Sequence, residues 1–395
     1  MTSLNGLTVL SMEQATVLPY FTYRLVQEGA RVIRMEHPKY GDPNRKVGLS
    51  MPGEEGMNRY FLCINAGKEA ITLNLAEKEG KGLLARLLLE LEVDVFCTNQ
   101  LPSSYAKLGI EPKTLREIKP DLIWLGVSGF GPDHTEAAYD PILQARGGLM
   151  ELTGQAGGEP QVLGIPLPDM GTSEHAFGQI MKALYLREKT GAGDEIHLSM
   201  FASTVSWLTV PITLNKTFGQ TITRRGNTHQ FFAPVSVFPT KDGFIYLAVG
   251  NDRQFAAMVE LKEFAELARP EYQTNQGRIE DVKKLNRELA RLTSRLSSDK
   301  VVELLKSIKL PVSKIQTVKQ VVADPLINPT LLNSKDPVTG LELTLAPPPI
   351  WTSYLKERQG ALSFPPRKGE HNRSVYSSLG LKNGRLDELA SNGVI

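Results

Sequence analysis

Residues 7–36 read LTVLSMEQATVLPYFTYRLVQEGARVIRME, and this stretch decides the fold. It begins with a β-type run over 7–12, continues with an amphipathic helical pattern over 17–28, and ends with a second β-type run over 31–35. Pro19 lies near the first turn of the predicted helix, where a missing backbone N–H does little harm. The stretch therefore predicts one β–α–β unit.

The same alternation continues through the first half of the chain. Helical patterns and β-type runs follow one another at 80–92, 93–97, 114–118, 121–127, 171–189 and 195–199. Alternating units of this size are typical of a parallel sheet covered by helices on both faces. We therefore expect a large α/β domain.

The pattern changes near Pro211, where proline and glycine interrupt the alternation. Beyond it a strand is expected at 244–249 and helices at 251–262, 279–296 and 301–308. The segment 346–350 is polyproline-like and fits an extended connection. The predicted organisation is a large domain over 1–200 completed by the tail 360–395, a linker over 201–224, a small α+β domain over 225–325, and a return linker over 326–359.

Composition narrows the class of protein. The 395 residues include 45 Lys and Arg against 43 Asp and Glu, a balance that argues against nucleic-acid binding. The two cysteines, Cys63 and Cys97, are far apart, and the six histidines show no metal-binding spacing, so no metal is expected. No signal-peptide pattern and no apolar run of membrane-spanning length is seen. We expect a cytoplasmic enzyme with no membrane or nucleic-acid partner.

Asp169 is the most informative candidate for chemistry. It follows Pro166 and Pro168 and precedes the predicted helix over 171–189. One interpretation is an ordinary helix N-cap. The other is an oxygen nucleophile, because a helix N-terminus favours the ionised carboxylate and lowers its pKa. Two other motifs fail: the turn over 126–131 lacks the spacing of a nucleophile elbow, and no glycine follows the first strand to hold a dinucleotide.

Several segments together resemble the class III CoA-transferase family, which includes formyl-CoA and carnitine CoA-transferases. They are LNGLTVL (4–10), GARVIRME (29–36), GDPNR (41–45), NAGKEAITLNL (65–75), YDPILQA (139–145), PDMG (168–171), RGN (225–227), VGNDRQF (249–255) and PRKGEH (366–371). The resemblance runs the length of the chain. No single motif is decisive, but so many in the same order make coincidence improbable.

The resemblance implies roles for particular residues. The family nucleophile falls on Asp169. CoA contacts fall on Gln14, Ala15, Lys68, Leu73, Leu75, Asn99, Lys107 and Tyr139, and a mobile glycine loop falls on Gly250. Two departures are visible: the loop here reads Gly-Asn-Asp, and a position that carries lysine in some relatives is Ala137.

The resemblance also implies a fold and a reaction. The fold is a Rossmann-like large domain with a parallel sheet plus a smaller α+β domain, joined by long linkers into an open ring that interlocks with a second ring as a dimer. The reaction moves CoA from an acyl-CoA donor such as succinyl-CoA to a carboxylic acid through aspartyl–acyl anhydride and aspartyl–CoA thioester intermediates. Coenzyme A is the co-substrate, and the partner is an identical or a paralogous chain.

Two alternatives remain. An acyl-CoA racemase or epimerase of the same fold would need a base at the position of Tyr139, and tyrosine is a poor base at neutral pH. A non-catalytic subunit of a hetero-oligomeric transferase would not need Asp169. The substrate is open: Arg224, Arg225 and His229 suit a dicarboxylic acid or are surface charges. Trp207, Phe231 and Phe232 would suit an aromatic or branched acyl group.

Overall fold

The computed structural model describes residues 4–51, 54–136 and 138–395. Packing divides the chain into two compact units, which we describe separately. The first comprises Met1–Leu149, Val162–Gly219 and Pro329–Ile395, and the second comprises Met150–Gln161 and Gln220–Asn328. Within the described residues, no helix combines the length and apolar character needed to cross a membrane.

The first unit is built on a parallel sheet of six strands. They are β1 (Thr8–Met12), β2 (Arg31–Glu36), β5 (Glu69–Thr72), β6 (Val95–Thr98), β7 (Ile123–Ser128) and β8 (Glu195–Ser199). Their order is β5-β2-β1-β6-β7-β8, so the direction of strand addition reverses between β1 and β6. In such sheets the ligand crevice lies outside the carboxyl ends of the strands at this reversal.

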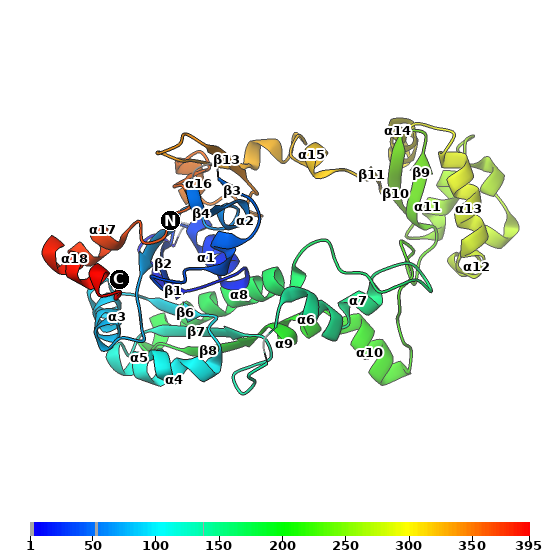
Figure 1. The fold of residues 1–395 in the computed structure, drawn as a ribbon. Helices are drawn as coiled ribbons and strands as arrows, with labels where there is room; N and C mark the ends of the chain where they lie inside the picture. Colours follow the sequence, from blue (N-terminus) through cyan, green and yellow to red (C-terminus); the bar gives the residue numbers. More distant parts are fainter. Residues whose placement is uncertain (1–3, 52–53, 137) are drawn as a thin grey trace. The chain divides into compact units, whose positions relative to one another are not determined.

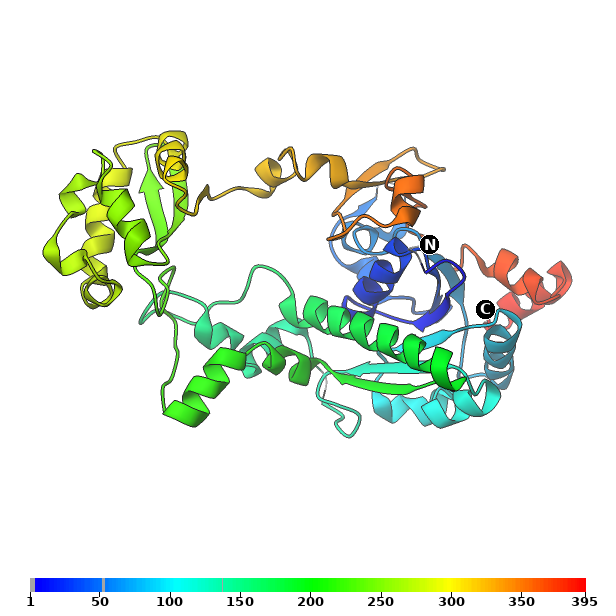
Figure 2. The same cartoon turned by 180° about the vertical axis from the view of Figure 1, so that it is seen from behind.

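Helices cover both faces of this sheet, as the alternation predicts (Figure 1). Side chains of β1, β6 and β7 point alternately to one face, where α1 (Val17–Gln27) and α8 (Leu167–Thr190) pack, and to the other, where α3 (Lys78–Glu90) packs. Figure 2 shows α8 lying along the sheet. Because both faces are buried, the strands are apolar nearly throughout.

The carboxyl-terminal segment packs beside the edge strand β5. The Tyr376 hydroxyl of α17 (Asn372–Ser378) donates to the Thr72 carbonyl at 2.8 Å, and the Asn74 amide donates to the Val394 carbonyl at 2.8 Å. Residues of α18 (Asn383–Ser391) join the same core as α3. The last residue, Ile395, is buried as well.

Further elements complete the first unit. They are β3 (Ser50–Met51), β4 (Glu54–Asn58), α2 (Arg59–Leu62), α4 (Tyr105–Leu108), α5 (Pro112–Ile118), α6 (Asp140–Arg146), α9 (Met200–Ser206), α10 (Thr209–Phe218), β12 (Leu332–Lys335), β13 (Glu342–Leu345), α16 (Ser353–Glu357) and β14 (Ala361–Leu362). Helices α9 and α10 occupy a range for which the sequence predicted a linker. Pro211 is compatible with α10 because it lies in the first turn, where backbone N–H groups have no intrahelical partner.

The second unit is an antiparallel sheet with helices. Its strands β9 (Val235–Thr240), β10 (Gly243–Ala248) and β11 (Val312–Lys314) run in the order β11-β10-β9, and α11 (Asp252–Val259), α12 (Asn275–Glu280), α13 (Val282–Thr293), α14 (Ser298–Ser307) and α15 (Val318–Val321) follow the chain. The helix predicted over 279–296 is interrupted at Asp281, whose backbone leaves the helical region at φ −110° and ψ 26°. Leu285, Leu289 and Leu305 fill its core.

Candidate active site

A cavity of about 550 Å³ lies at the carboxyl edge of the parallel sheet. The loops after β1, β6 and β7 contribute to its wall, together with the beginnings of α6 and α8. This is the crevice expected where the strand order reverses. Five of the residues predicted from the sequence line it: Gln14, Ala15, Asn99, Tyr139 and Asp169.

Asp169 belongs to the first turn of α8, and this corrects the position expected from the sequence. The helix begins at Leu167, with Pro168 in its first turn, so Asp169 follows the helix start and is not an N-cap. The residue lines the 550 Å³ cavity and also a neighbouring cavity of about 340 Å³, whose wall includes Gln144 and Ile165. Asp169 therefore contributes to the walls of two neighbouring cavities.

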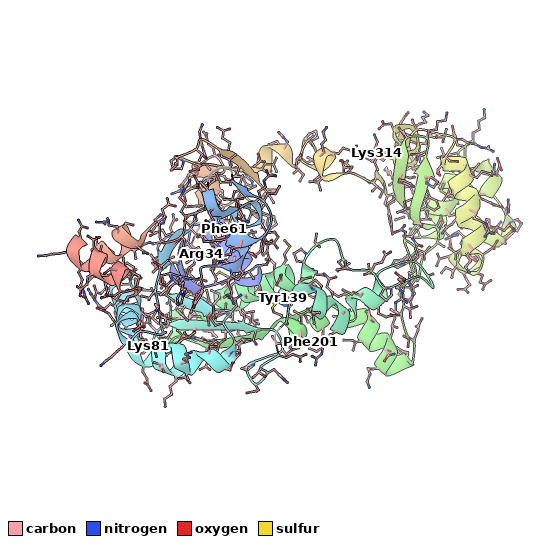
Figure 3. The ribbon with its side chains drawn as sticks, viewed as in Figure 1. Arg34, Phe61, Lys81, Tyr139, Phe201 and Lys314 are labelled. Carbon is pink, nitrogen blue, oxygen red and sulfur yellow. The ribbon has the colours of Figure 1, made fainter. Side chains whose placement is uncertain are left out.

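The carboxylate of Asp140, at the start of α6, faces the backbone of Asp169. Its Oδ2 accepts the Asp169 backbone N–H at 3.1 Å, and its Oδ1 accepts the Gln144 side-chain amide at 2.6 Å. Asp140 thus satisfies one of the free amides of the α8 first turn. Tyr139, labelled in Figure 3, precedes it and is 74% exposed at the cavity mouth.

The pKa of Asp169 is raised, and this overturns the expected lowering by the helix N-terminus. Partial burial, with the negative charge of Asp140 as a second cause, raises the pKa of Asp169 to about 7. Burial also raises the pKa of Asp140. The loss of water and the second carboxylate outweigh the favourable helix end, and no basic side chain among the described residues forms an ion pair with Asp169 or Asp140.

The loop after β1 is held by side chains from two other loops. Asn99 accepts the Gln14 backbone N–H at 3.1 Å and donates to the Gln14 carbonyl at 2.8 Å. Asp42 accepts the Ala15 N–H at 3.1 Å, and the Asn44 amide donates to the Ala15 carbonyl. Ala15 has φ of 60°, a conformation that non-glycine residues rarely adopt. Because these backbone groups are engaged, the Gln14 side chain is the polar group that this loop can offer to a ligand.

The first turns of α8 are fixed against α1 and α9. The Ser173 hydroxyl donates to the Val17 carbonyl at 2.6 Å. A Cβ at Gly171 would lie 2.9 Å from the Trp207 indole nitrogen, so this glycine permits a close approach. The Trp207 ring in turn stacks on His175 at 5.2 Å. Asp169 is therefore carried by a rigid helix end.

A network of buried charges lies beneath the β1 loop. Lys68 contacts Glu13 at 2.8 Å, and Arg34 contacts Asp42 at 2.7 Å. Arg34 also packs on the Phe61 ring, 4.6 Å from its centroid. Both residues are labelled in Figure 3. Burial lowers the pKa of Lys68 to about 8, although Glu13 opposes the change. This network supports the loop that carries Gln14 and Ala15.

The other predicted CoA contacts lie elsewhere. The Lys68 ammonium is buried and already bonded to Glu13, Asn65 and the Pro19 carbonyl. Leu73 and Leu75 are buried in the core beside α3, whereas Lys107 is exposed at the end of α4. These four side chains are absent from the cavity wall, and their roles stay predictions. Ala137 lies outside the described residues.

The glycine loop prediction concerns the second unit. The Gly250 backbone N–H donates to the side-chain oxygen of Gln254 at 2.7 Å. The side chain of Asn251 caps α11 by accepting the backbone N–H of Gln254 at 2.9 Å. Asp252 is paired with the buried Arg278 at 2.8 Å. In this structure the segment is an anchored helix start. Whether it moves over a substrate stays a prediction.

Sequence reasoning missed the roles of Asp140, Asp42 and Asn44. Each lies in a segment that the sequence analysis quoted, but each acts on a residue distant in the chain; the Asp140–Asp169 contact spans 29 residues. The usable signal was their place in the segments that follow predicted strands, because parallel strands bring such segments together at one edge of the sheet.

Comparisons with known proteins show the family to which the chain belongs. A model described as CoA-transferase family III matches residues 4–372. Human succinyl-CoA:glutarate CoA-transferase is 30% identical over 400 residues, covering 99% of this chain and 90% of its own length. Succinyl-CoA:mesaconate CoA-transferase of Haloarcula marismortui is 31% identical, covering 97% and 98%. A CAIB/BAIF family protein from Brucella suis superposes with a TM-score of 0.83 at 29% identity, over 96% of this chain and 100% of that one. The chain therefore belongs to CoA-transferase family III and is an enzyme of that class.

Proposed function

We propose that this enzyme moves CoA from succinyl-CoA to a second carboxylic acid and that Asp169 is its nucleophile. The observation that carries the proposal is that Asp169, in the first turn of α8, lines the cavity at the carboxyl edge of the parallel sheet and has its pKa raised to about 7. A carboxylate with little water around it is a stronger nucleophile than a solvated one. Succinyl-CoA is proposed because it is the donor in the names of the human and Haloarcula relatives.

The reaction proceeds in four steps on one carboxylate. A carboxylate oxygen of Asp169 attacks the succinyl-CoA carbonyl, the C–S bond breaks, and an aspartyl–succinyl anhydride and CoA thiolate form. The thiolate attacks the aspartyl carbonyl and releases succinate, leaving an aspartyl–CoA thioester. The acceptor carboxylate attacks this thioester and displaces the thiolate. The thiolate then attacks the acceptor carbonyl of the second anhydride, giving the new CoA ester and free Asp169.

The Gln14 side chain is the group that we assign to the developing oxyanion. It lines the same cavity as Asp169, and its backbone is held on both sides by Asn99. A fixed donor of this kind stabilises charge that appears only in the transition state. Tyr139, exposed at the same cavity, is assigned to contact the acyl-CoA.

A dicarboxylic acceptor is proposed, because glutarate and mesaconate, the acids in the names of the human and Haloarcula relatives, are both dicarboxylic. Transfer rates with matched mono- and dicarboxylic acids test this. A KM that is no lower for the dicarboxylic acids would refute it.

We also propose that two chains, identical or paralogous, interlock as open rings through the predicted linkers. Exposed apolar side chains support contact with a second chain. Val318 and Leu326 are 80% and 83% exposed, and Phe218 on α10 is 69% exposed. Large apolar interfaces of obligate dimers bury such residues. Native mass spectrometry should detect a dimer at nanomolar concentration. A folded monomer that binds CoA there would refute interlocking.

The nucleophile is tested by trapping the intermediate. The protein is incubated with succinyl-CoA without an acceptor, digested, and analysed by mass spectrometry. We expect a CoA adduct on the peptide that contains Asp169, removable by hydroxylamine, and none in Asp169→Asn. Exposed Asp387 provides a matched control, since Asp387→Asn should form the adduct like the wild type. Turnover without any adduct on Asp169 would refute the proposal.

A further inference from the structure

The loop after β1 brings Gln14 and Ala15 to the wall of the 550 Å³ cavity, which we call the reaction cavity. Side chains from two other loops bond all four backbone polar groups of this pair. Asn99 accepts the N–H of Gln14 and donates to its carbonyl. Asp42 accepts the Ala15 N–H at 3.1 Å, and the Asn44 amide donates to the Ala15 carbonyl. The conformation of the pair is therefore decided by residues at least 27 positions away in the chain.

Ala15 has a backbone conformation that alanine rarely adopts. Its φ of 60° lies in the left-handed region, where the Cβ atom comes too close to the following carbonyl oxygen. The other non-glycine residues with positive φ in the described part of the chain follow the ends of α3, α14 and α16, where this conformation is common: Glu92, Lys309 and Gln359. Ala15 follows a strand, so no helix end accounts for it. Such conformations persist only where the surrounding structure holds them.

Asp42 connects this strained residue to the interior of the first unit. Asp42 is buried, and its Oδ1 accepts the backbone N–H groups of Ala15 at 3.1 Å and of Asn44 at 2.9 Å. Its Oδ2 accepts from Arg34 at 2.7 Å. Arg34, labelled in Figure 3, is fully buried on β2 and also donates to Asn65 at 2.6 Å. One oxygen of Asp42 thus holds the strained loop, and the other is fixed by a buried guanidinium.

The position of Gln14 depends on the conformation of Ala15. Thr16 is the N-cap of α1, so the chain beyond Ala15 is fixed by that helix. If Ala15 relaxed to the right-handed region, its φ would turn from 60° to about −60°. With the helix held in place, this rotation would carry the Gln14 side chain out of its place in the cavity wall. The strained conformation therefore determines which group the loop offers to a ligand.

We propose that Asp42 is a positioning residue for CoA transfer, which holds Ala15 in the left-handed conformation and thereby keeps the Gln14 side chain in the wall of the reaction cavity. The inference rests on the proposed function, in which the Gln14 side chain stabilises the oxyanion. Asp42 is not among the described residues that line this cavity, so its effect reaches the reaction through the backbone. Loss of a donor that acts in the transition state lowers kcat and leaves KM little changed.

Asp42→Asn separates the two sides of this carboxylate. An amide has one acceptor oxygen, and the charged Arg34 is a stronger donor than the Ala15 N–H. We therefore expect the amide oxygen to face Arg34 and the NH2 group to face Ala15, which breaks the bond that holds the loop. Asn44→Ala is a second variant. It frees the Ala15 carbonyl without any change beside Arg34, so the test does not depend on the stability of Asp42→Asn.

Asp336 provides a matched control in the same unit. It lies in the turn after β12 and is buried like Asp42. Its Oδ2 accepts from Arg367 at 2.9 Å, and its Oδ1 accepts the Val338 backbone N–H at 3.1 Å. Asp336 is also absent from the described residues of the cavity wall. Asp336→Asn therefore disturbs the same kind of buried pair away from the Gln14 loop.

Each variant is made with the natural Ala15 and with Ala15→Gly, and transfer from succinyl-CoA is measured. Asp42→Asn should lower kcat by about tenfold with the natural alanine, because the left-handed conformation of alanine is disfavoured by about that factor. With Ala15→Gly, the same change should lower kcat by less than about threefold, because glycine adopts positive φ readily. The KM for succinyl-CoA should change little. Asn44→Ala should show the same dependence on residue 15, and Asp336→Asn should leave kcat unchanged.

Hydrogen exchange provides a readout that does not depend on activity. The peptide that contains Ala15 is followed by mass spectrometry after transfer to deuterated water. Because Asp42 accepts the Ala15 N–H, this amide should exchange about tenfold faster in Asp42→Asn, which loses a hydrogen bond to a charged group. Its exchange in Asp336→Asn should match the wild type.

The results distinguish this inference from the proposed function. An unchanged kcat in Asp42→Asn, or a loss of the same size with Ala15 and with Ala15→Gly, would overturn the positioning role. An equal loss of kcat in Asp336→Asn would overturn it as well, since it would show a general cost of disturbing a buried pair. Faster exchange at Ala15 in Asp42→Asn, in a protein that transfers CoA from succinyl-CoA to no acid, would refute the proposed function and leave the hold of Asp42 on Ala15 standing.

Discussion

Two carboxylates of the first unit, both removed from water, have pKa values that are shifted in opposite directions. Glu36 lies between Arg34 and Arg45, and although burial opposes it, these guanidinium groups lower the pKa of Glu36 to about 2. Asp169 has Asp140 as its charged neighbour, and its pKa is raised to about 7. Both are carboxylates removed from water. The sign of the neighbouring charge makes the difference. Beside cations the ionised carboxylate is stabilised and contributes to folding, whereas beside another carboxylate it is destabilised, as is common for reactive groups.

The largest expected effect is a loss of activity on substitution of Asp169, the carboxylate whose charged neighbour is Asp140. Asp169→Asn keeps the shape of the side chain but removes the nucleophile, so kcat should fall by about 10³-fold or more. CoA binding, measured by calorimetry, should change little. The same carboxylate-to-amide change at Asp387 should leave kcat as it is. Retention of more than about a tenth of wild-type turnover in Asp169→Asn would contradict the role assigned to it.

Glu36→Gln should have the largest effect on stability. The change leaves the buried guanidinium of Arg45 without its ion-pair partner and removes a contact of Arg34, which keeps Asp42 at 2.7 Å. Breaking a buried pair typically lowers the unfolding free energy by about 3–5 kcal/mol. Denaturant unfolding monitored by circular dichroism measures this. The double variant Glu36→Gln/Arg45→Met should recover part of the loss. A Glu36→Gln protein as stable as the wild type would show that these charges do not lock the fold.

Asp169→Asn should stabilise the protein at alkaline pH. The folded protein disfavours the ionised form of Asp169, whose pKa rises from 3.8 to about 7, so ionisation costs unfolding free energy that is fully felt above pH 7. Removing the charge should raise the unfolding free energy by about 2 kcal/mol at pH 8, after allowance for partial exposure. The gain should vanish as the pH falls towards 4. A gain independent of pH would point to packing instead.

The smallest effect is expected from Asp140→Asn. This change removes the second negative charge while an amide oxygen can still accept the Asp169 backbone N–H. The acid limb of kcat/KM, which reports the ionisation of Asp169 in the free enzyme, should move to lower pH. The pH profile of kcat/KM from pH 5 to 9 measures the shift. An unchanged limb, with normal folding, would show that burial alone raises the pKa of Asp169.

Local patterns predicted most of the first unit. The strands at 7–12 and 31–35 and the helix at 17–28 occur within a residue of the expected bounds, because burial on both faces leaves a clear alternation of apolar runs. The sequence did not predict helix α10, because Pro211 favours an interruption of the chain's regular structure. In the structure Pro211 lies in the first turn of α10, where a helix tolerates proline. The three-stranded sheet of β12, β13 and β14 joins short segments through non-local pairs, which periodicity does not report.

The sequence predicted several residues that line the cavity, but it did not predict the direction of the Asp169 pKa shift. Asp169, Gln14, Ala15, Asn99 and Tyr139 share one cavity, which ordered motifs suffice to suggest. The sign of the Asp169 pKa shift was predicted wrongly because it depends on burial and then on Asp140, 29 residues away in the chain. Charge networks such as that of Glu13 and Lys68 are likewise decided by contacts between residues far apart in the chain.

The packing of the chain's last residues beside β5 affects the order of events during synthesis. The Thr72 carbonyl receives its hydrogen bond from Tyr376, 304 residues later, so this strand edge stays uncovered until Tyr376 has been synthesised. At about 5–20 residues per second, that interval is roughly 15–60 s. The second unit ends at Asn328 and is therefore synthesised in full before then. A nascent chain can thus complete its small unit while the parallel sheet still lacks the helices that cover β5.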